Sequence, residues 1–184
     1  GADGDRMGEA ARKIIDWKQP DFIDINFGCP VNKVVSKNGG SSLLRDCPVL
    51  ASVATGVARA VGHQVPVTAK IRIGWDEQSI NAPEVCTILQ DCGMQAISIH
   101  GRTRAQSYRG EANWEVIDEC SRHVAVPVVG NGDLASVTVD DDGLGIARQR
   151  RTCRRVARVA DRHLSLEPVQ MLGSEYLRHQ PHRP

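Results

Sequence analysis

The chain has 184 residues, of which 41% are hydrophobic and 24% are charged, and its formal net charge is +1. This composition is typical of a soluble globular domain with a core of its own, and the near-neutral charge does not indicate a nucleic-acid-binding protein. No apolar run approaches the ~20 residues of a membrane span, and the first residues lack the apolar centre of a signal peptide.

Hydrophobic periodicity predicts helices and short strands in alternation. In chain order the expected elements are helix 8–17, strand 22–27, helix 43–61, strand 65–73, helix 83–93, strand 96–100, helix 114–120 and strand 124–129. Pro83 suits the first turn of its helix because its missing N–H costs nothing there, and Gly93 suits the helix end.

The predicted strands are rich in Ile and Val, and we expect them to be apolar on both faces, as in a parallel sheet covered by helices. Either a closed (β/α)8 barrel or an open doubly wound sheet would fit. No G-x-G-x-x-G follows the first strand, which favours the barrel. A whole barrel needs ~250 residues and eight strands. The sequence therefore predicts an α/β fold that is a partial TIM (β/α)8 barrel with parallel strands.

The last part of the sequence is different in kind, with nine arginines and three acidic residues after residue 143. We expect residues 137–142 to be a strand end or a loop, and residues 148–155 to begin a basic helix. Such an arginine run is most often a solvated face. The predicted division is a catalytic barrel over 1–134 and an atypical Arg-rich tail over 135–184, which is either disordered or read out of frame.

Six cysteines are present and none forms a C-x-x-C pair, so we expect neither a zinc site nor a redox dithiol, and no bound metal. The chain is not a small secreted one, so a disulfide framework is not expected either. Reduced thiols in the cytosol are the default interpretation.

Polar residues follow each of the four predicted strands. They are Cys29 after the first strand, Lys70 and Arg72 in the second, His100 and Arg102 after the third, and Asn131, Gly132 and Asp133 after the fourth. Ligands of parallel α/β proteins bind at the carboxyl ends of the strands. Four such strand ends in succession predict the rim of an active site.

Cys29 stands in the turn after the first strand, between Gly28 and Pro30. A free thiol is mostly protonated at neutral pH, so it can donate a proton, or attack if its pKa is lowered. The alternative is a buried structural cysteine. The glycine-rich segment 38–41 nearby favours a loop, and hence the chemical role.

Each of the other strand ends has a structural alternative. Alternation places Lys70 and Arg72 on one face, either in an ion pair at the strand end or as cations facing a developing negative charge. His100 is either a structural residue or, with Arg102 close behind, part of an anion or cofactor site. Segment 131–133 is either a simple turn or a contact for phosphate and ribityl groups. Tyr108, Arg109 and Trp114 line the mouth of the site or pack against the following helix.

Residues 1–134 resemble the catalytic barrel of the tRNA-dihydrouridine synthases, most closely the bacterial branch. The matching stretches, in the same order and spacing, are 24–30, 65–75, 99–103, 108–110 and 126–133. The resemblance implies a cytoplasmic flavoprotein with FMN, reduced by NADPH, which reduces the C5–C6 bond of uridine in tRNA. In that family an earlier part of the barrel, a later phosphate-binding strand and a helical tRNA-docking domain complete the enzyme, and none has a match here.

The resemblance also implies a role for each strand end. Cys29 would protonate C5 of uridine, Asn26 and Arg102 would bind the substrate, Lys70 and His100 would contact the flavin, and Asn131, Gly132 and Asp133 would hold the ribityl and phosphate groups. Two other functions stay open: a dihydroorotate-type flavin oxidoreductase, and an inactive fragment that binds RNA through its basic tail. The sequence does not indicate an oligomeric state.

Overall fold

The structure, a computed structural model, describes residues 1–139 and 145–149. Its elements are α1 (Gly4–Lys18), β1 (Ile23–Asn26), α2 (Asn32–Val35), the 3-10 helix η1 (Gly40–Arg45), α3 (Cys47–Val61), β2 (Val67–Arg72), α4 (Ala82–Asp91), β3 (Ala96–His100), α5 (Trp114–His123), β4 (Val128–Asn131), β5 (Leu134–Val139) and β6 (Gly145–Gln149).

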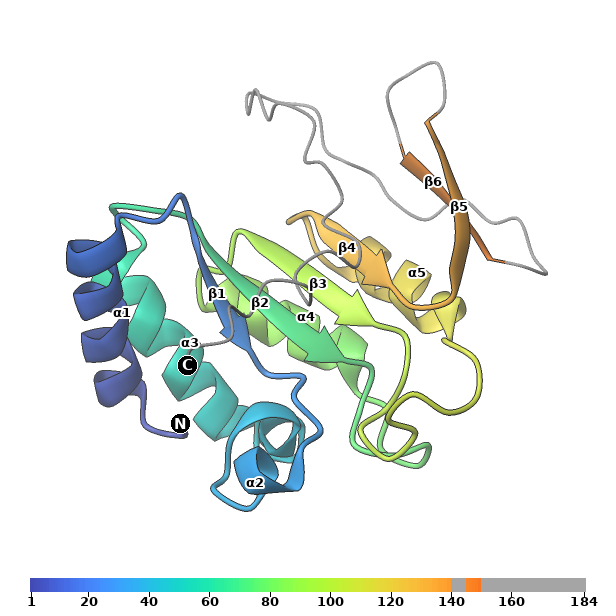
Figure 1. The fold of residues 1–184 in the computed structure, drawn as a ribbon, viewed down its shortest axis with the longest axis horizontal. Coiled ribbons are helices and arrows are strands. Elements are labelled where there is room, and N and C mark those ends of the chain that lie inside the picture. Colours follow the sequence, from blue (N-terminus) through green and yellow to red (C-terminus); the bar gives the residue numbers. More distant parts are fainter. Residues whose placement is uncertain (140–144, 150–184) are drawn as a thin grey trace, which may run out of the picture.

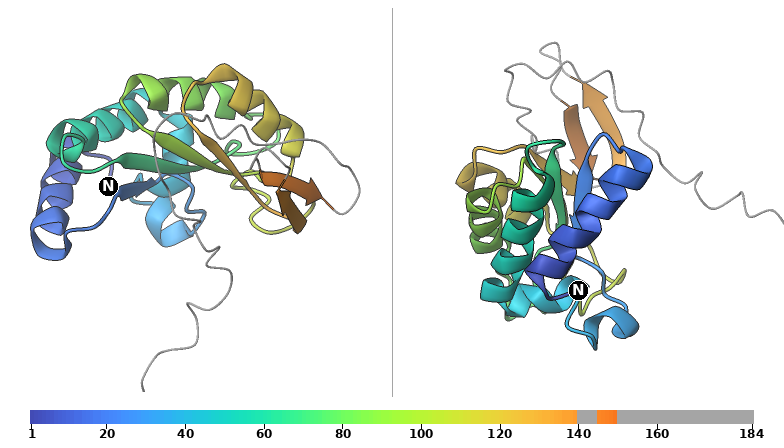
Figure 2. Two further views of the ribbon diagram at one scale, coloured as in Figure 1. Left: turned by 90° about the horizontal axis from the view of Figure 1, so that it is seen from above. Right: turned by 90° about the vertical axis from the view of Figure 1, so that its left-hand side faces the viewer.

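Strands β1 to β4 form one parallel sheet, in which each strand pairs with the next one along the chain (Figure 1). Helices α3, α4 and α5 connect them and lie along one side of the sheet, as the left view of Figure 2 shows. A doubly wound sheet would instead reverse its strand order and carry helices on both sides. Sequential order with helices on one side is the winding of a (β/α)8 barrel, so the predicted partial barrel is confirmed.

Residues alternate along each strand between the helix-covered side and the opposite side, which we call the open face. Ile25, Ala69 and Ile97 are buried against the helices, whereas Asp24 and Asn26 are exposed on the open face. The prediction that the strands are apolar on both faces is therefore wrong. The open face carries polar side chains because it borders the site described below.

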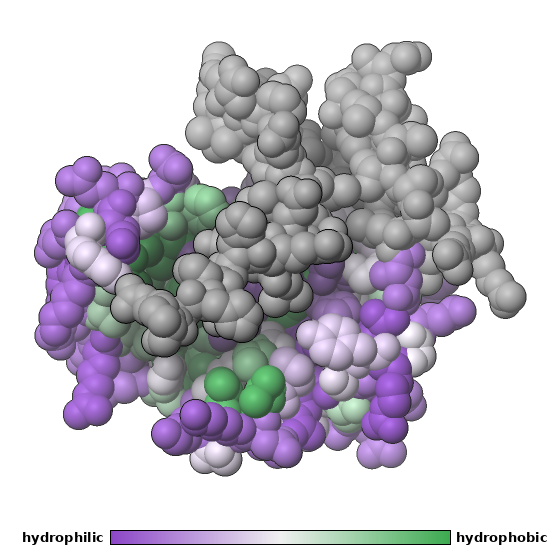
Figure 3. Space-filling model, viewed as in Figure 1, coloured by the Kyte–Doolittle hydropathy of each residue, from purple (hydrophilic) through white to green (hydrophobic). Residues whose placement is uncertain are grey.

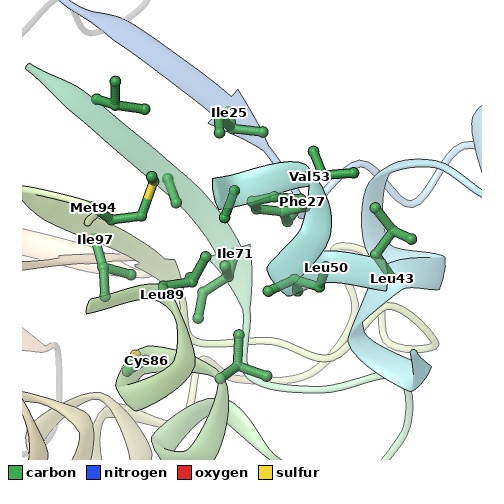
Figure 4. Packing of buried hydrophobic residues seen from close by; sticks show 14 of the residues in the cluster. Ile25, Phe27, Leu43, Leu50, Val53, Ile71, Cys86, Leu89, Met94 and Ile97 are labelled. Atoms are coloured by element: carbon green, nitrogen blue, oxygen red, sulfur yellow. The ribbon is translucent and has the colours of Figure 1, made fainter. Parts of the chain in front are cut away.

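One hydrophobic core fills the space between the sheet and its helices (Figure 4). Ile71 from β2 and Ile97 from β3 point toward α3 and α4, where Leu50 and Leu89 are fully buried. Burying each of these aliphatic side chains contributes roughly 1.5–3 kcal/mol to folding. The core thus fixes the strands from one side and leaves their carboxyl ends free for chemistry.

The helix predicted over 43–61 is divided in the structure, so that part of the prediction is wrong. Residues 40–45 form η1, and α3 begins only after Asp46, whose carboxylate accepts a hydrogen bond from the Val49 N–H at 3.2 Å. Pro48 occupies the first turn of α3, where a missing N–H costs nothing. An Asp cap followed by Pro is a strong start signal, and it overrides the helical periodicity of Leu43 and Leu44.

Other boundaries differ by a few residues. Helix α1 begins earlier than expected because Asp3 accepts a hydrogen bond from the Arg6 N–H at 3.0 Å, and α2 was not predicted. Strands β5 and β6 pair antiparallel in a separate sheet, which places residues 148 and 149 in a strand and not in the expected helix. The expectations for residues 140–144 and 150–184 lie outside the described residues.

Within residues 1–139 and 145–149, none of the helices combines the length and the apolar character needed to cross a bilayer.

Candidate active site

An open cleft of about 760 Å³ lies at the carboxyl ends of the parallel strands. Its lining residues are Asn26, Gly28, Cys29, Pro30, Val31, Asn32, Lys70, Arg72, His100, Arg104, Ala105, Ser107, Tyr108 and Asn131. Five of the predicted site residues are therefore brought together: Asn26, Cys29, Lys70, His100 and Asn131. Arg102, Gly132 and Asp133 lie outside this lining. Figure 3 shows hydrophobic surface over α2, where Val31 and Val34 are exposed.

Strand register explains why residues so distant in sequence meet. Asn26 of β1 is paired with Lys70 of β2. Two residues later in β2, Arg72 is paired with His100 of β3, and His100 is in turn paired with Asn131 of β4. Side chains at paired positions of neighbouring strands point to the same side of a sheet. The side chains of both sets of paired residues therefore lie on the same side of the sheet, at the carboxyl ends of its strands.

The main chain of Cys29 is held by a neighbouring loop. Its carbonyl accepts hydrogen bonds from the Ser41 N–H at 3.1 Å and the Ser41 hydroxyl at 2.8 Å. Gly40 lies against it with φ +57°, and a side chain there would come within 2.8 Å of the Cys29 carbonyl oxygen. Only glycine allows both that conformation and that approach. The half-buried thiol thus sits on a fixed loop beside the cleft.

Arg72 connects the Cys29 loop to the loop after β3. Its Nε donates to the Gly28 carbonyl at 3.0 Å, and its Nη1 donates to the carbonyls of Thr103 at 3.0 Å and Ser107 at 2.8 Å. Burial lowers the pKa of Arg72, yet a guanidinium stays protonated in proteins. Arg72, only 3% exposed, therefore places a fixed positive charge next to the loop that carries Cys29.

Lys70 is a half-buried ammonium with no ion pair or hydrogen bond among the described residues. Burial and then the charge of Arg72 lower its pKa, and the charge of Asp24 opposes this only in part. A buried charge without a counter-ion is costly unless a ligand supplies one. Arg72 and Arg104 add further cations, and the described lining contains no carboxylate, so the cleft suits an anionic or electron-rich ligand.

Arg104 crosses from the loop after β3 to α2. Its Nη2 donates to the Asn32 side chain at 2.6 Å, and its guanidinium carbon lies 4.6 Å from the centre of the Trp75 ring. Its buried Nε has no partner among the described residues. Arg104 was not predicted, because an arginine within a loop carries no pattern. Arg72 was expected among the polar residues of the rim, but no contact with cofactor or substrate was predicted for it.

His100 and Arg102 are both 8% exposed. Arg102 Nη1 lies 3.3 Å from His100 Nε2, and its Nη2 donates to the Gly110 carbonyl at 2.8 Å and to Asp133 Oδ1 at 2.6 Å. Burial, then the charges of Arg72, Lys70 and Arg102, lower the pKa of His100 to about 4, although Asp133 opposes them. His100 is therefore neutral at physiological pH.

Residues 132 and 133, which follow β4, are held in place by hydrogen bonds from the segment before α5 and from its first residue. The Trp114 indole N–H donates to the Gly132 carbonyl at 3.0 Å, and the Asp133 Oδ2 accepts from the Ala112 N–H at 2.6 Å. Trp114 therefore packs behind the strand end, whereas Tyr108 lines the cleft. Arg109 lines a separate hollow beside Asp76. No group of three or more His, Cys, Asp or Glu side chains in the described part of the chain could hold a metal ion.

These features define one class of protein: a partial (β/α)8 barrel with a cationic cleft and a thiol at the carboxyl ends of its strands. The family model described as dihydrouridine synthase (Dus) matches residues 1–142, and the chain belongs to this family. The resemblance recognised in the sequence is thereby confirmed.

Curated relatives agree with the family assignment. The chain is 47% identical over 133 residues to a probable tRNA-dihydrouridine synthase 1 of Synechocystis sp.. The aligned residues make up 72% of this chain and 37% of the relative. It is 44% identical over 134 residues to tRNA-dihydrouridine synthase B of Escherichia coli, covering 73% and 41%. The chain thus spans about two fifths of the length of the curated relatives it matches.

Among solved structures, an N-acetylneuraminate lyase from Mycoplasma synoviae is 20% identical with a TM-score of 0.48, covering 74% of this chain and 43% of the lyase. A likeness this slight supports no conclusion about function.

Proposed function

We propose that this chain is the part of an FMN-dependent tRNA-dihydrouridine synthase that carries the proton donor and several flavin contacts. The reaction adds hydrogen across the C5–C6 bond of uridine in tRNA, with hydride derived from NADPH. The observation that carries the proposal is the meeting of Cys29, Lys70, His100 and Asn131 in one cleft of a chain that belongs to the dihydrouridine synthase family. Because tRNA is the proposed substrate, the cytoplasm is the proposed place of action.

The cleft fits FMN in size and in charge. Its volume of about 760 Å³ falls within the 300–1,000 Å³ range typical of cofactor sites. Lys70 lacks a counter-charge among the described residues, and FMN supplies carbonyl oxygens, a phosphate and, once reduced, a negatively charged ring. We assign Lys70 and His100 to the ring, and Asn131 with the backbone of Gly132 and Asp133 to the ribityl and phosphate groups. When bound, FMN supplies the hydride that is added to C6 of uridine.

Cys29 supplies the proton. Addition of hydride at C6 leaves an electron pair at C5, and the Cys29 S–H transfers its proton there, so that one C–H bond forms at each carbon and the C5–C6 double bond becomes single. The resulting thiolate regains a proton from solvent. Cations near the cleft, Arg72 foremost, stabilise the negative charge that develops during the transfer.

Asn26 is assigned to the target base because its side chain lines the cleft next to Lys70. A uridine within a tRNA must leave its stack to reach such a site, at a cost of a few kcal/mol. The cations that line the cleft, Lys70, Arg72 and Arg104, attract the phosphates on either side of that base. Arg104 is the described cation best placed for this, because its guanidinium is stacked on Trp75 and already oriented.

The cofactor assignment is tested on the full chain by titration with FMN, followed by quenching of flavin fluorescence. We expect saturable binding, and a loss of at least tenfold in affinity for Lys70→Met. The matched control is Lys13→Met, an exposed helical lysine paired with Glu9 at 2.9 Å, which is expected to bind FMN like the unaltered chain. Absence of saturable binding by the unaltered chain would overturn the assignment.

The reaction is tested by placing the matching segment of this chain into the Escherichia coli relative, in a strain that lacks its own synthases. Dihydrouridine in tRNA is then measured by mass spectrometry. We expect Cys29→Ala to abolish the product while FMN still binds. Cys92→Ala is expected to retain the product, because the Cys92 thiol contacts the Ala51 carbonyl and neither residue lines the cleft. Product formation by Cys29→Ala at the unaltered rate would show that Cys29 is not the proton donor.

A further inference from the structure

Arg102 is a large cation that the active cleft does not use directly. It is buried, it is absent from the cleft lining, and its guanidinium makes contacts on three sides. Two of these contacts, the Gly110 carbonyl and the Asp133 carboxylate, are acceptors that hold it in place. The third contact is the ring of His100, which does line the cleft.

The contact between Arg102 and His100 determines the tautomer of the histidine. A guanidinium has only donors, so the N–H of Arg102 Nη1 can be accepted at 3.3 Å only by an unprotonated His100 Nε2. A neutral imidazole carries one proton, which must then be on Nδ1. Among the described residues, Nδ1 has no hydrogen-bond partner.

The rest of the surroundings hold the ring in the same orientation. Gly132 lies against its Nε2 edge: a side chain at Gly132 would come 3.3 Å from His100 Cδ2 and 3.5 Å from Nε2. The Tyr108 ring lies 6.2 Å away at an angle of 50°. The Nε2 edge therefore faces protein, and the free donor is at the opposite edge.

Asp133 makes this arrangement stable. Burial opposes its ionisation, but the Ala112 N–H and the Arg102 guanidinium hold the pKa of Asp133 below its ordinary value. Both of its oxygens are engaged, one by Arg102 and one by Ala112. The carboxylate thus neutralises and orients the guanidinium, which in turn orients the imidazole.

We infer that Arg102, anchored by Asp133 and Gly110, is a positioning residue that fixes His100 as the neutral Nδ1–H tautomer, so that the His100 ring presents one hydrogen-bond donor, Nδ1–H, to an acceptor atom of the ligand. The ligand atom at that point must be a hydrogen-bond acceptor, such as a carbonyl oxygen or an unprotonated ring nitrogen. The inference rests on the proposed function only for the identity of the ligand, FMN, and not for the tautomer.

Charged groups on every side keep His100 neutral. Arg72 on β2 is paired with it across the strands, Lys70 lies on the same strand as Arg72, and Arg102 follows it on the next loop. Asp133 is the only carboxylate among the described groups that act on the ring, and it is already bound to Arg102. Protonation would place a further positive charge among three, so the tautomer persists across the neutral pH range.

The test is long-range ¹H–¹⁵N NMR of the imidazole rings of the full chain, between pH 6 and 8 and without ligand. The chain has six histidines, and His100→Asn identifies the resonances of His100. We expect an unprotonated Nε2, a protonated Nδ1 and no titration. A protonated Nε2, or titration within this range, would overturn the inference even if FMN binds, whereas failure to bind FMN would leave the tautomer result standing.

Variants connect the tautomer to ligand binding. An asparagine amide can replace Nδ1, whereas a glutamine amide replaces Nε2, so we expect both variants to bind FMN more weakly than the unaltered chain and His100→Gln to bind it at least about threefold more weakly than His100→Asn. Arg102→Met is expected to give a mixture of tautomers in the same NMR spectrum and to weaken FMN binding, and Arg102→Lys to restore both in part. Equal affinities of the Asn and Gln variants would contradict the inference, and the spectrum of the unaltered chain decides even if Arg102→Met does not fold.

Discussion

Replacing Arg72 by Met tests whether the loop that carries Cys29 depends on one buried guanidinium. The substitution keeps most of the side-chain volume but removes three hydrogen bonds to the carbonyls of Gly28, Thr103 and Ser107. A hydrogen bond from a charged donor contributes about 1.5 kcal/mol or more to stability. The carbonyls of Gly28 and Ser107 lie in partly exposed surroundings and can bind water instead, which reduces the expected loss to about 3 kcal/mol.

Urea unfolding followed by tryptophan fluorescence measures this loss. Arg109→Met is the matched control because Arg109 is exposed and lies outside the cleft, so its free energy of unfolding is expected to change by less than about 0.5 kcal/mol. Arg72→Lys keeps the charge but not the three-way geometry, and we expect it to recover less than half of the loss.

The same variants are compared by alkylation of Cys29 with iodoacetamide under native conditions. Loss of the Gly28 contact frees the loop, so Cys29 is expected to react several-fold faster in Arg72→Met than in Arg109→Met. If the two variants are equally stable and their Cys29 thiols react at the same rate, the assignment of Arg72 as the anchor of the thiol loop is refuted.

Three further predictions concern single contacts. The pKa of His100 is about 4 in the folded chain and about 6.5 ordinarily, so its stabilising effect is complete above pH 6.5 and is lost as the pH falls toward 4. The free energy of unfolding measured in urea should therefore fall by about 2 kcal/mol between pH 7 and 4.5 because of His100, and this contribution should be absent in His100→Asn. Equal losses in the two proteins would contradict this prediction. Gly40→Ala forces a side chain against Cys29 and strains the backbone, because Gly40 has φ +57°. It should lower the free energy of unfolding by about 1–2 kcal/mol and change the alkylation rate of Cys29. Gly39→Ala, at a position with an extended backbone, should change that rate little. Asp46→Ala removes the cap of α3 and should cost about 1 kcal/mol in thermal or urea unfolding, and an unchanged midpoint would show that the cap contributes nothing.

The sequence carried much of the fold, because short Ile- and Val-rich runs ending in polar residues are a local pattern. It also predicted five residues that line the cleft, since parallel strands bring their carboxyl ends to one edge whatever the loops do. The contacts made by side chains within the loops could not be predicted from the sequence. Arg102 meets Gly110 and Asp133, 8 and 31 positions away, and no pattern in the sequence links these three residues.

The errors have physical causes as well. Helical periodicity continued through Asp46, although an Asp cap followed by Pro starts a new helix there. Polar open-face residues such as Asp24 and Thr68, which form a hydrogen bond at 2.7 Å, contradict a sheet that is apolar on both sides. The division of the chain at residue 134 and the nature of residues 135–184 stay predictions, as do the chemical roles of the individual site residues.

Side chains alternate in β1 to β3, so odd positions pack against the helices and even positions face the open side, although the even-numbered Arg72 and His100 at the strand ends are buried as well. Substitutions at Ala69 or Ile97 alter packing and so affect folding, whereas substitutions at Lys70 or Ser98, one residue away, face the open side and leave that packing intact. A barrel wound in this way can therefore acquire a new ligand preference through neighbouring codons without first losing its stability.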